Sequence, residues 1–235
     1  YIGLAIASYE WMAAVTLVVV AFFFLPKFLQ SGVYTAPEFL RVRFNESVRL
    51  IMAVFTMVIY VGVTISAVIY SGALTLSTLF PAVGLVTAAW IIGVIAALYV
   101  VTGGLKAVAW ADLIQGSALI LAGGVILVLA LRALGASPVD ELTFTTAAPG
   151  VADGAGGWTK LMALNEDKLH MALPAWDLVL PWTALAVGLW IPNFYYWGLN
   201  QYIIQRTLGS ESLAEGQRGA VFAAALKLLI PFVIV

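Results

Sequence analysis

The stretch Leu189-Trp-Ile-Pro-Asn-Phe-Tyr-Tyr-Trp-Gly-Leu-Asn-Gln-Tyr-Ile-Ile-Gln-Arg206 combines apolar residues with a proline, amide side chains and a cluster of aromatic rings. If the stretch is helical, the spacing i, i+3, i+4, i+7, i+8 places on one face Asn193, Tyr196, Trp197, Asn200 and Gln201. Amides and rings inside a membrane segment are typical of a face turned towards a polar ligand or a water-filled cavity. The stretch therefore predicts a membrane helix with a solute-binding face.

The composition of the whole chain indicates an integral membrane protein. Of its 235 residues, 63% are hydrophobic and 10% are charged, and the mean hydropathy is +1.04, whereas soluble domains have about 25% charged residues. The chain has no cysteine and a single histidine, His170, which argues against thiol-ligated and histidine-cluster metal sites. No nucleotide-binding, nucleophile or zinc motif occurs in a plausible context, so we expect neither an enzyme nor a resident cofactor or metal.

A membrane-spanning helix needs roughly 20 apolar residues. On this criterion we predict an all-α fold with transmembrane helices at about 4–26, 37–79, 82–102, 106–135, 178–207 and 211–235. The intervening segment 136–177 is rich in Gly, Thr, Ala and Pro, and we expect an ordered or partly helical loop outside the membrane. Both ends of the chain lie inside apolar runs, which leads us to expect a piece of a longer protein.

The positions of the basic residues predict the orientation in the membrane. Loops that alternate onto one side carry Lys27, Arg41, Arg43, Lys106, Arg206 and Arg218. Because cytoplasmic loops are enriched in Lys and Arg, this side is predicted to be cytoplasmic. The loop 136–177 is then extracellular or periplasmic, and the predicted location is the cell inner (plasma) membrane.

Two ionisable residues stand out within the predicted spans. Glu10 lies in the first span, and Lys227 lies about 15 residues, or about 22 Å of helix, beyond the cytoplasmic end of the last one. Such residues commonly mark transport pathways, and the two charges could both bind a polyhydroxylated ligand. The structural alternatives are that Glu10 lies near the outer interface, that Lys227 extends to an interface, or that the two pair directly.

Three further features have both a functional and a structural interpretation. Pro192 and Asn193 predict a broken or bent helix that exposes carbonyl groups to a ligand, although a simple kink is equally compatible. Tyr196 and Trp197 can stack on the apolar face of a sugar ring, whereas Tyr202 can belong to an interfacial aromatic belt. Asp112, near the start of the fourth span, fits a helix-start carboxylate better than a cation-attracting group.

Three motifs resemble the sodium:solute symporter family, and within it the bacterial sodium/galactose cotransporters. They are Tyr1-Ile-Gly-Leu-Ala-Ile-Ala-Ser-Tyr-Glu-Trp-Met12, Gly103-Gly-Leu-Lys-Ala-Val-Ala-Trp-Ala-Asp-Leu-Ile-Gln115 and Asn193-Phe-Tyr-Tyr-Trp-Gly-Leu-Asn-Gln-Tyr-Ile-Ile-Gln-Arg206. The resemblance implies two inverted five-helix repeats (a LeuT-like fold), of which this chain covers the second to sixth core helices and the start of the seventh. It also implies a sodium site on the first and eighth helices, which lie outside this chain.

The resemblance implies roles for individual residues. The positions matching Glu10, Asn193 and Lys227 hydrogen-bond the sugar, with those matching Tyr9 and Trp197 nearby. The position matching Tyr196 stacks over the sugar as the inner gate, and the one matching Asp112 belongs to the sodium exit route.

Two positions depart from the galactose carriers. Ala13 stands where they have a sugar-binding serine, and Thr64 stands where they have an asparagine. Another hexose or a related polyol is therefore open as the substrate.

Together these observations predict sodium-coupled transport of a galactose- or glucose-like hexose by alternating access. The expected partners are the sugar, sodium ions, the lipid bilayer and the remaining helices of the transporter, with no nucleic acid. The alternatives are a symporter of another small solute (an amino acid, a nucleobase or a polyol), a non-transporting sugar sensor or channel, and a purely structural membrane subunit.

Overall fold

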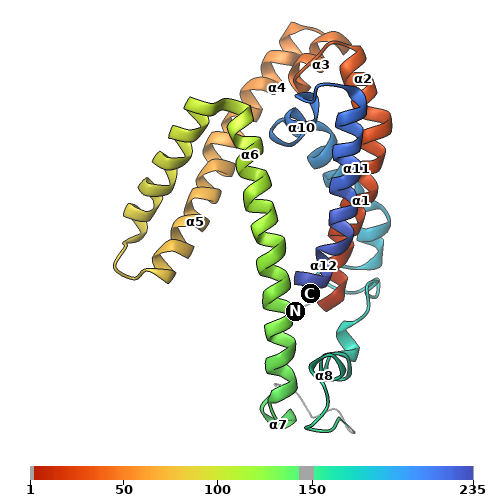
Figure 1. Cartoon of the computed structure of the whole chain (residues 1–235). Coiled ribbons are helices and arrows are strands. Elements are labelled where there is room, and N and C mark those ends of the chain that lie inside the picture. Colours follow the sequence, from red (N-terminus) through yellow and green to blue (C-terminus); the bar gives the residue numbers. More distant parts are fainter. Residues whose placement is uncertain (1–2, 143–150, 235) are drawn as a thin grey trace. The chain divides into compact units, whose positions relative to one another are not determined.

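A computed structural model describes residues 3–142 and 151–234 of the chain (Figure 1). Every named element in these ranges is helical, and one isolated bridge joins Leu173 to Pro181. The chain divides into two compact units. Unit 1 contains residues 1–27 and 116–235, unit 2 contains residues 28–115, and each unit is described separately below.

Four of the described helical stretches are long and apolar enough to cross a membrane: Gly3–Gln30, Glu46–Leu79, Leu85–Ala136 and Leu213–Val233. The first comprises η1 (Gly3–Ile6), α1 (Ala7–Val19), the π-helical turn η2 (Val20–Phe24) and α2 (Leu25–Gln30). The second comprises α4 (Glu46–Ile59), the π-helical turn η3 (Tyr60–Ile65) and α5 (Ser66–Leu79). The predicted class, an all-helical multi-pass membrane protein, is confirmed at this level.

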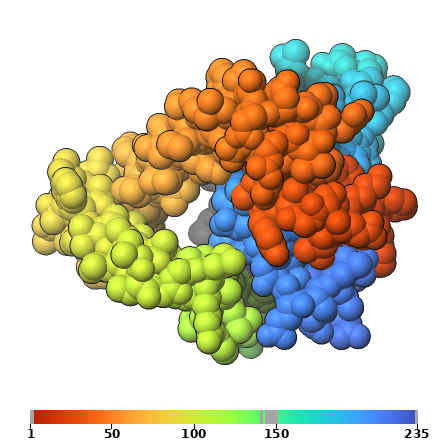
Figure 2. Space-filling view, turned by 90° about the horizontal axis from the view of Figure 1, so that it is seen from above, coloured from red at the N-terminus to blue at the C-terminus, as the bar shows by residue number. Residues whose placement is uncertain are grey.

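Unit 1 is built on the contact between α1 and α11 (Leu213–Leu229). Both Figure 1 and Figure 2 show the red N-terminal helix beside the blue C-terminal helix. The buried residues of the two helices are mainly small, including Ala13 and Ala14 on α1 and Ala220 and Ala224 on α11. Small residues let two helix backbones approach closely, which is the usual basis of helix association in lipid. A short helix, α12 (Pro231–Ile234), follows α11.

The predicted helix 178–207 is divided into short elements in the structure. They are the π-helical turn η5 (Ala184–Gly188), α9 (Trp190–Phe194), the π-helical turn η6 (Tyr195–Leu199) and α10 (Gln201–Leu208). Pro192 lies inside α9, and the break comes later, at Asn200, whose backbone is extended (φ −72°, ψ 116°). The helix is thus interrupted, as one of the two interpretations of Pro192 and Asn193 predicted, but the interruption lies at Asn200, eight residues after the proline.

This region is preceded by a tight turn at Asp177. The backbone N–H groups of Leu180 and Val179 each donate a 2.8 Å hydrogen bond to Asp177 Oδ1. These bonds stabilise the charged form of the carboxylate and lower the pKa of Asp177.

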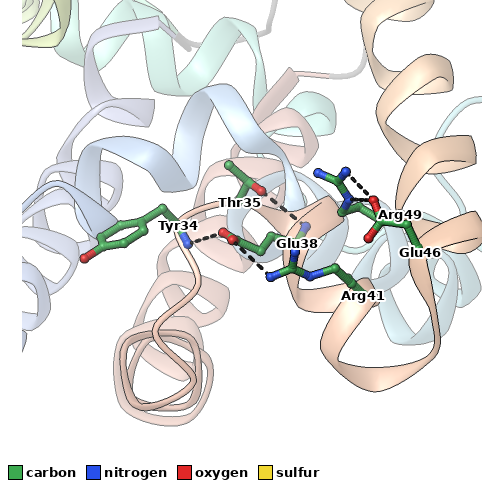
Figure 3. Close-up of polar contacts among 6 residues, drawn as sticks. All are labelled: Tyr34, Thr35, Glu38, Arg41, Glu46 and Arg49. Atoms are coloured by element: carbon green, nitrogen blue, oxygen red, sulfur yellow. Dashed lines mark hydrogen bonds and ion pairs between the residues drawn. The ribbon is translucent and has the colours of Figure 1, made fainter.

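The predicted helix 37–79 is interrupted in unit 2. It begins as α3 (Ala36–Arg43), stops at Phe44, and restarts at α4 with Asn45 as its N-cap. Thr35 caps α3 by accepting a hydrogen bond from Glu38 N–H, and Glu38 in turn accepts one from Tyr34 N–H (Figure 3). Arg41 pairs with Glu38 in the first turn of α3, and Arg49 pairs with Glu46 in the first turn of α4. The reciprocal bonds at Thr35 fix where α3 starts, and the side chain of Asn45, which accepts a hydrogen bond from Val48 N–H, fixes where α4 starts.

The predicted third and fourth helices form one element, α6 (Leu85–Ala136), in which Gly104 is non-helical (φ 55°, ψ −151°). Gly104 is the kink that joins the two helical parts of α6, and Figure 1 shows α6 as two helices that run in different directions. Only glycine adopts such a backbone readily, because a Cβ atom would clash. The part of α6 that precedes Gly104 packs against α5 through glycines. Ile92 lies against Gly72, and Ile69 lies against Gly93.

The loop predicted at 136–177 is partly helical where the structure describes it. It contains α7 (Val139–Leu142), α8 (Gly157–Leu164) and η4 (Glu166–Lys168), and its residues 143–150 lie outside the described part. Lys160 on α8 is fully buried. Its ammonium group donates hydrogen bonds to the carbonyl oxygens of Gly135 (3.0 Å), Ser137 (2.8 Å) and Asp153 (2.6 Å).

This arrangement lets one side chain tie the end of α6 to the loop. An ammonium group has three donors, so the three carbonyl oxygens satisfy it completely. Gly157 lies so close to the backbone of Leu131 that a Cβ atom would overlap its carbonyl group, which brings α8 near enough for Lys160 to reach. Nothing in the local sequence distinguished Lys160 from a solvated lysine.

We predict that Lys160→Met frees the loop from α6. Three carbonyl groups lose their donor, which we expect to cost about 2–4 kcal/mol locally. Chymotrypsin also cleaves after methionine, so digestion of the intact protein is followed at the sites already present, Trp158, Leu161 and Leu164. These sites should be cut roughly tenfold faster in the variant. The exposed Lys168→Met is the matched control, and equal cleavage rates in the two variants would contradict the structural role of Lys160.

Candidate functional site

Glu10 and Lys227, the two ionisable residues singled out in the predicted spans, meet in unit 1. Glu10 on α1 and Lys227 on α11 are 217 residues apart in the chain, and Lys227 Nζ lies 2.5 Å from Glu10 Oε2. Their side chains are only 27% and 19% exposed, respectively. Of the arrangements considered from the sequence, direct pairing is the one that the structure contains.

The position of the pair follows from the packing of its two helices. Ala13 and Ala14 lie one turn beyond Glu10 on α1, and Ala223 and Ala224 lie one turn before Lys227 on α11. Ala14 and Ala224 form a buried cluster with Leu17, against which Ala223 also packs. These small side chains bring the helices close enough for a carboxylate and an ammonium group to meet. A partly buried pair of this kind compensates two charges that would each be costly in lipid.

Trp197 adds an aromatic wall to the pair. The Lys227 ammonium lies 4.8 Å from the centroid of the Trp197 ring, within the range of a cation–π contact. Trp197 also packs against the cluster of Ala14, Leu17 and Ala224, which fixes the ring. The site thus offers a hydrogen-bond acceptor, a donor and an aromatic face within one small region.

Tyr196 continues the aromatic wall. Its ring meets Trp197 edge-on, with centroids 4.9 Å apart and an interplanar angle of 80°. Its hydroxyl oxygen accepts a 2.8 Å hydrogen bond from the hydroxyl of Tyr202. From the sequence, Tyr202 was a candidate for an interfacial aromatic belt and was not connected to this group. Only the break at Asn200 turns the chain so that the two hydroxyls can meet.

The other residues predicted to bind solute are less directly connected. Asn193 is buried on α9, which packs on α1, and its Nδ2 donates a 2.9 Å hydrogen bond to the carbonyl oxygen of Leu189. Tyr9 is exposed, and consecutive residues of an α-helix point about 100° apart, so it projects away from Glu10. The structure therefore brings together Glu10, Lys227, Trp197 and Tyr196, while Asn193 lies on a neighbouring element.

The single polar face predicted for residues 193–201 is wrong in detail. That prediction assumed a regular α-helix, but η6 is π-helical and Asn200 is extended, so the register changes after Phe194. π-helical turns inserted in helices are frequent at functional sites. A regular-helix projection had no means of detecting this change.

Asp112 is exposed and belongs to unit 2, whereas the residues just described belong to unit 1. The structure gives it an interaction of its own. Within the described residues, no group of three or more His, Cys, Asp or Glu side chains could hold a metal ion. The proposed role of Asp112 on an ion route stays a prediction.

We predict strong energetic coupling between Glu10 and Lys227. Glu10→Gln or Lys227→Met alone leaves one charge without its partner and should destabilise the intact protein by about 1–3 kcal/mol, less than a fully buried pair. The loss of stability in the double variant should be smaller than the sum of the losses in the two single variants. Thermal unfolding in detergent measures this cycle, with the exposed Glu211→Gln as the control, and strictly additive effects would show that the pair does not interact.

Comparison with known proteins agrees with these features. The sequence model of the sodium:solute symporter family matches residues 1–235. The sodium/glucose cotransporter of Vibrio parahaemolyticus is 40% identical over the whole chain, which covers 41% of that relative. An uncharacterized symporter of Escherichia coli strain K12, YidK, is 37% identical over 99% of the chain and 40% of its own length.

A mammalian relative shows a weaker but equally extensive similarity. Sodium/glucose cotransporter 1 of the sheep, Ovis aries, is 30% identical over 99% of the chain and 35% of its own length. The chain thus spans about two fifths of the length of the curated relatives it matches. The resemblance seen in the three sequence motifs is confirmed: this chain belongs to the sodium:solute symporter family.

Proposed function

We propose that this chain forms part of the core of a sodium-coupled sugar transporter with two inverted helix repeats. The observation that carries the proposal is the Glu10–Lys227 pair with Trp197 beside it. Sodium-coupled solute transport follows from membership of the family. The choice of a sugar rests on the chemistry of this site and on relatives whose names describe sodium/glucose cotransporters.

The chemistry of the site suits a neutral polyhydroxylated ligand. Each sugar hydroxyl both donates and accepts hydrogen bonds, so a carboxylate can accept from one hydroxyl while an ammonium group donates to another. The net charge of the pair is zero, which suits a neutral hexose better than a ligand with a single charge. Trp197 and Tyr196 supply aromatic faces for the apolar face of a pyranose ring.

The proposed site residues have distinct tasks. Glu10, Lys227 and Asn193 hydrogen-bond the sugar, and Tyr9 and Trp197 complete its surroundings. Tyr196 covers the sugar as the gate on the cytoplasmic side. Asp112 lies on the route by which sodium leaves.

Transport then proceeds by alternating access in the cell inner membrane. Sodium binds helices of the intact protein that lie outside this chain and favours the outward-facing state. The sugar binds at mid-membrane, and the two repeats rock around it so that it is released to the cytoplasm. The ion supplies the driving force, while residues of this chain bind and orient the sugar.

Transport by the intact protein in proteoliposomes tests the proposal. An inward sodium gradient should drive accumulation of labelled glucose or galactose above the external concentration, and an equal potassium gradient should not. Sodium-dependent currents without accumulation would instead indicate a sensor or channel. Accumulation of an amino acid or a nucleobase in place of both hexoses would contradict the sugar assignment.

Asn193 offers a sharper test, because the chain contains a matched control. Asn165 Nδ2 also donates to a carbonyl oxygen four residues earlier, that of Leu161, at 3.0 Å, so Asn165→Ala and Asn193→Ala remove equivalent internal bonds. We predict that Asn193→Ala raises the KM for sugar about fivefold to tenfold, as expected for one lost hydrogen bond. Asn165→Ala should leave KM unchanged. Equal KM values for the two variants would remove Asn193 from the sugar site.

A further inference from the structure

We propose that Tyr202 is a positioning residue that holds the gate residue Tyr196 through their hydroxyl–hydroxyl bond. The inference rests on the proposed function, because Tyr196 is a gate only if the chain transports a solute. The Tyr202 hydroxyl donates to the Tyr196 oxygen at 2.8 Å, and the two rings meet edge-on with centroids 6.0 Å apart. One side-chain contact thus fixes both the hydroxyl and the ring of the gate.

The break at Asn200 explains why such a contact is needed. The backbone bond from Asn200 N–H to Tyr195 O, 2.9 Å long, closes η6. The next bonds, from Ile203 N–H and Ile204 N–H to Asn200 O, open α10. Tyr196 and Tyr202 consequently belong to helical elements on opposite sides of an extended residue. Their hydroxyl bond links these elements directly across the break.

The two partners of this bond differ in how firmly they are held. On α10, Ile204 and Leu208 are buried and anchor the helix, and the Arg206 guanidinium donates to the Tyr202 carbonyl oxygen. Tyr196 is 38% exposed, and η6 ends at the extended residue. Tyr202 therefore provides a fixed point, and the ring of Tyr196 is the part that can move.

The contact reaches the proposed sugar site through an unbroken series of side chains. Tyr202 contacts Tyr196, Tyr196 meets Trp197 edge-on, and the Trp197 ring lies under the Lys227 ammonium. Lys227 in turn pairs with Glu10. Loss of the hydroxyl bond should loosen the aromatic wall and leave the ion pair itself intact. This outcome separates a positioning role from a sugar-binding role.

The test removes one oxygen atom at a time. Tyr202→Phe and Tyr196→Phe each remove the hydroxyl–hydroxyl bond and keep both rings. Because either single change already removes this bond, the double variant loses no additional interaction between the two residues. We expect each single variant to raise both the KM for sugar and the rate of sugar efflux from loaded proteoliposomes roughly fivefold, the effect typical of one hydrogen bond. The double variant should match the single ones. Tyr195→Phe, at an exposed neighbouring tyrosine, is the control and should behave as the unmodified protein.

A second readout does not depend on transport. Amide hydrogen exchange of the intact protein, measured by mass spectrometry over residues 195–201, should speed up equally in Tyr202→Phe and Tyr196→Phe and stay unchanged in Tyr195→Phe. The proposal is overturned if Tyr202→Phe equals the control in exchange, or if the two tyrosine effects add in the double variant. If the unmodified protein transports no sugar, the proposed function fails, and the exchange measurement still decides whether Tyr202 holds Tyr196.

Discussion

The pairing of Glu10 with Lys227 is the constraint on which the rest of unit 1 depends. A lone carboxylate or ammonium group on a membrane helix costs roughly 2.5–3.5 kcal/mol even on the more lenient scales. The two groups compensate each other only if α1 and α11 approach closely, and the alanines of both helices make this approach possible. The same closeness brings Trp197 against Lys227 and sets the aromatic wall beside the charges. The contacts that stabilise unit 1 are therefore also those of the proposed solute site.

An ion pair in this position also has the properties of a binding site. Each of the two groups is a stronger hydrogen-bonding partner than a neutral side chain. A sugar that inserts its hydroxyls between them replaces one set of charge-assisted bonds with another. The cost of binding is then smaller than the cost of separating the charges in lipid. A direct hydrophobic contact between α1 and α11 would be equally compact but would provide no hydrogen-bonding groups for a sugar.

Much of this could be read from the sequence, and the reasons for the failures are specific. Composition and length of apolar runs predicted the membrane class, and Glu10 and Lys227 stood out because charged residues are rare in spans. The cap at Thr35 and the turn at Gly104 had local signals as well. The break at Asn200, the π-helical turn η6 and the link from Tyr202 to Tyr196 had none, because they depend on how the helix meets its neighbours. Lys160 was missed for the same reason, since two of its three acceptors, the carbonyl groups of Gly135 and Ser137, lie 25 and 23 residues earlier in the chain.

The most direct test of the central claim is a structure of the intact protein with sodium and a bound hexose. The account predicts sugar hydroxyls within about 3.2 Å of both the Glu10 carboxylate and the Lys227 ammonium, with the ring of Tyr196 against the sugar. A hexose bound elsewhere, with the 2.5 Å contact between Glu10 and Lys227 unchanged, would contradict it.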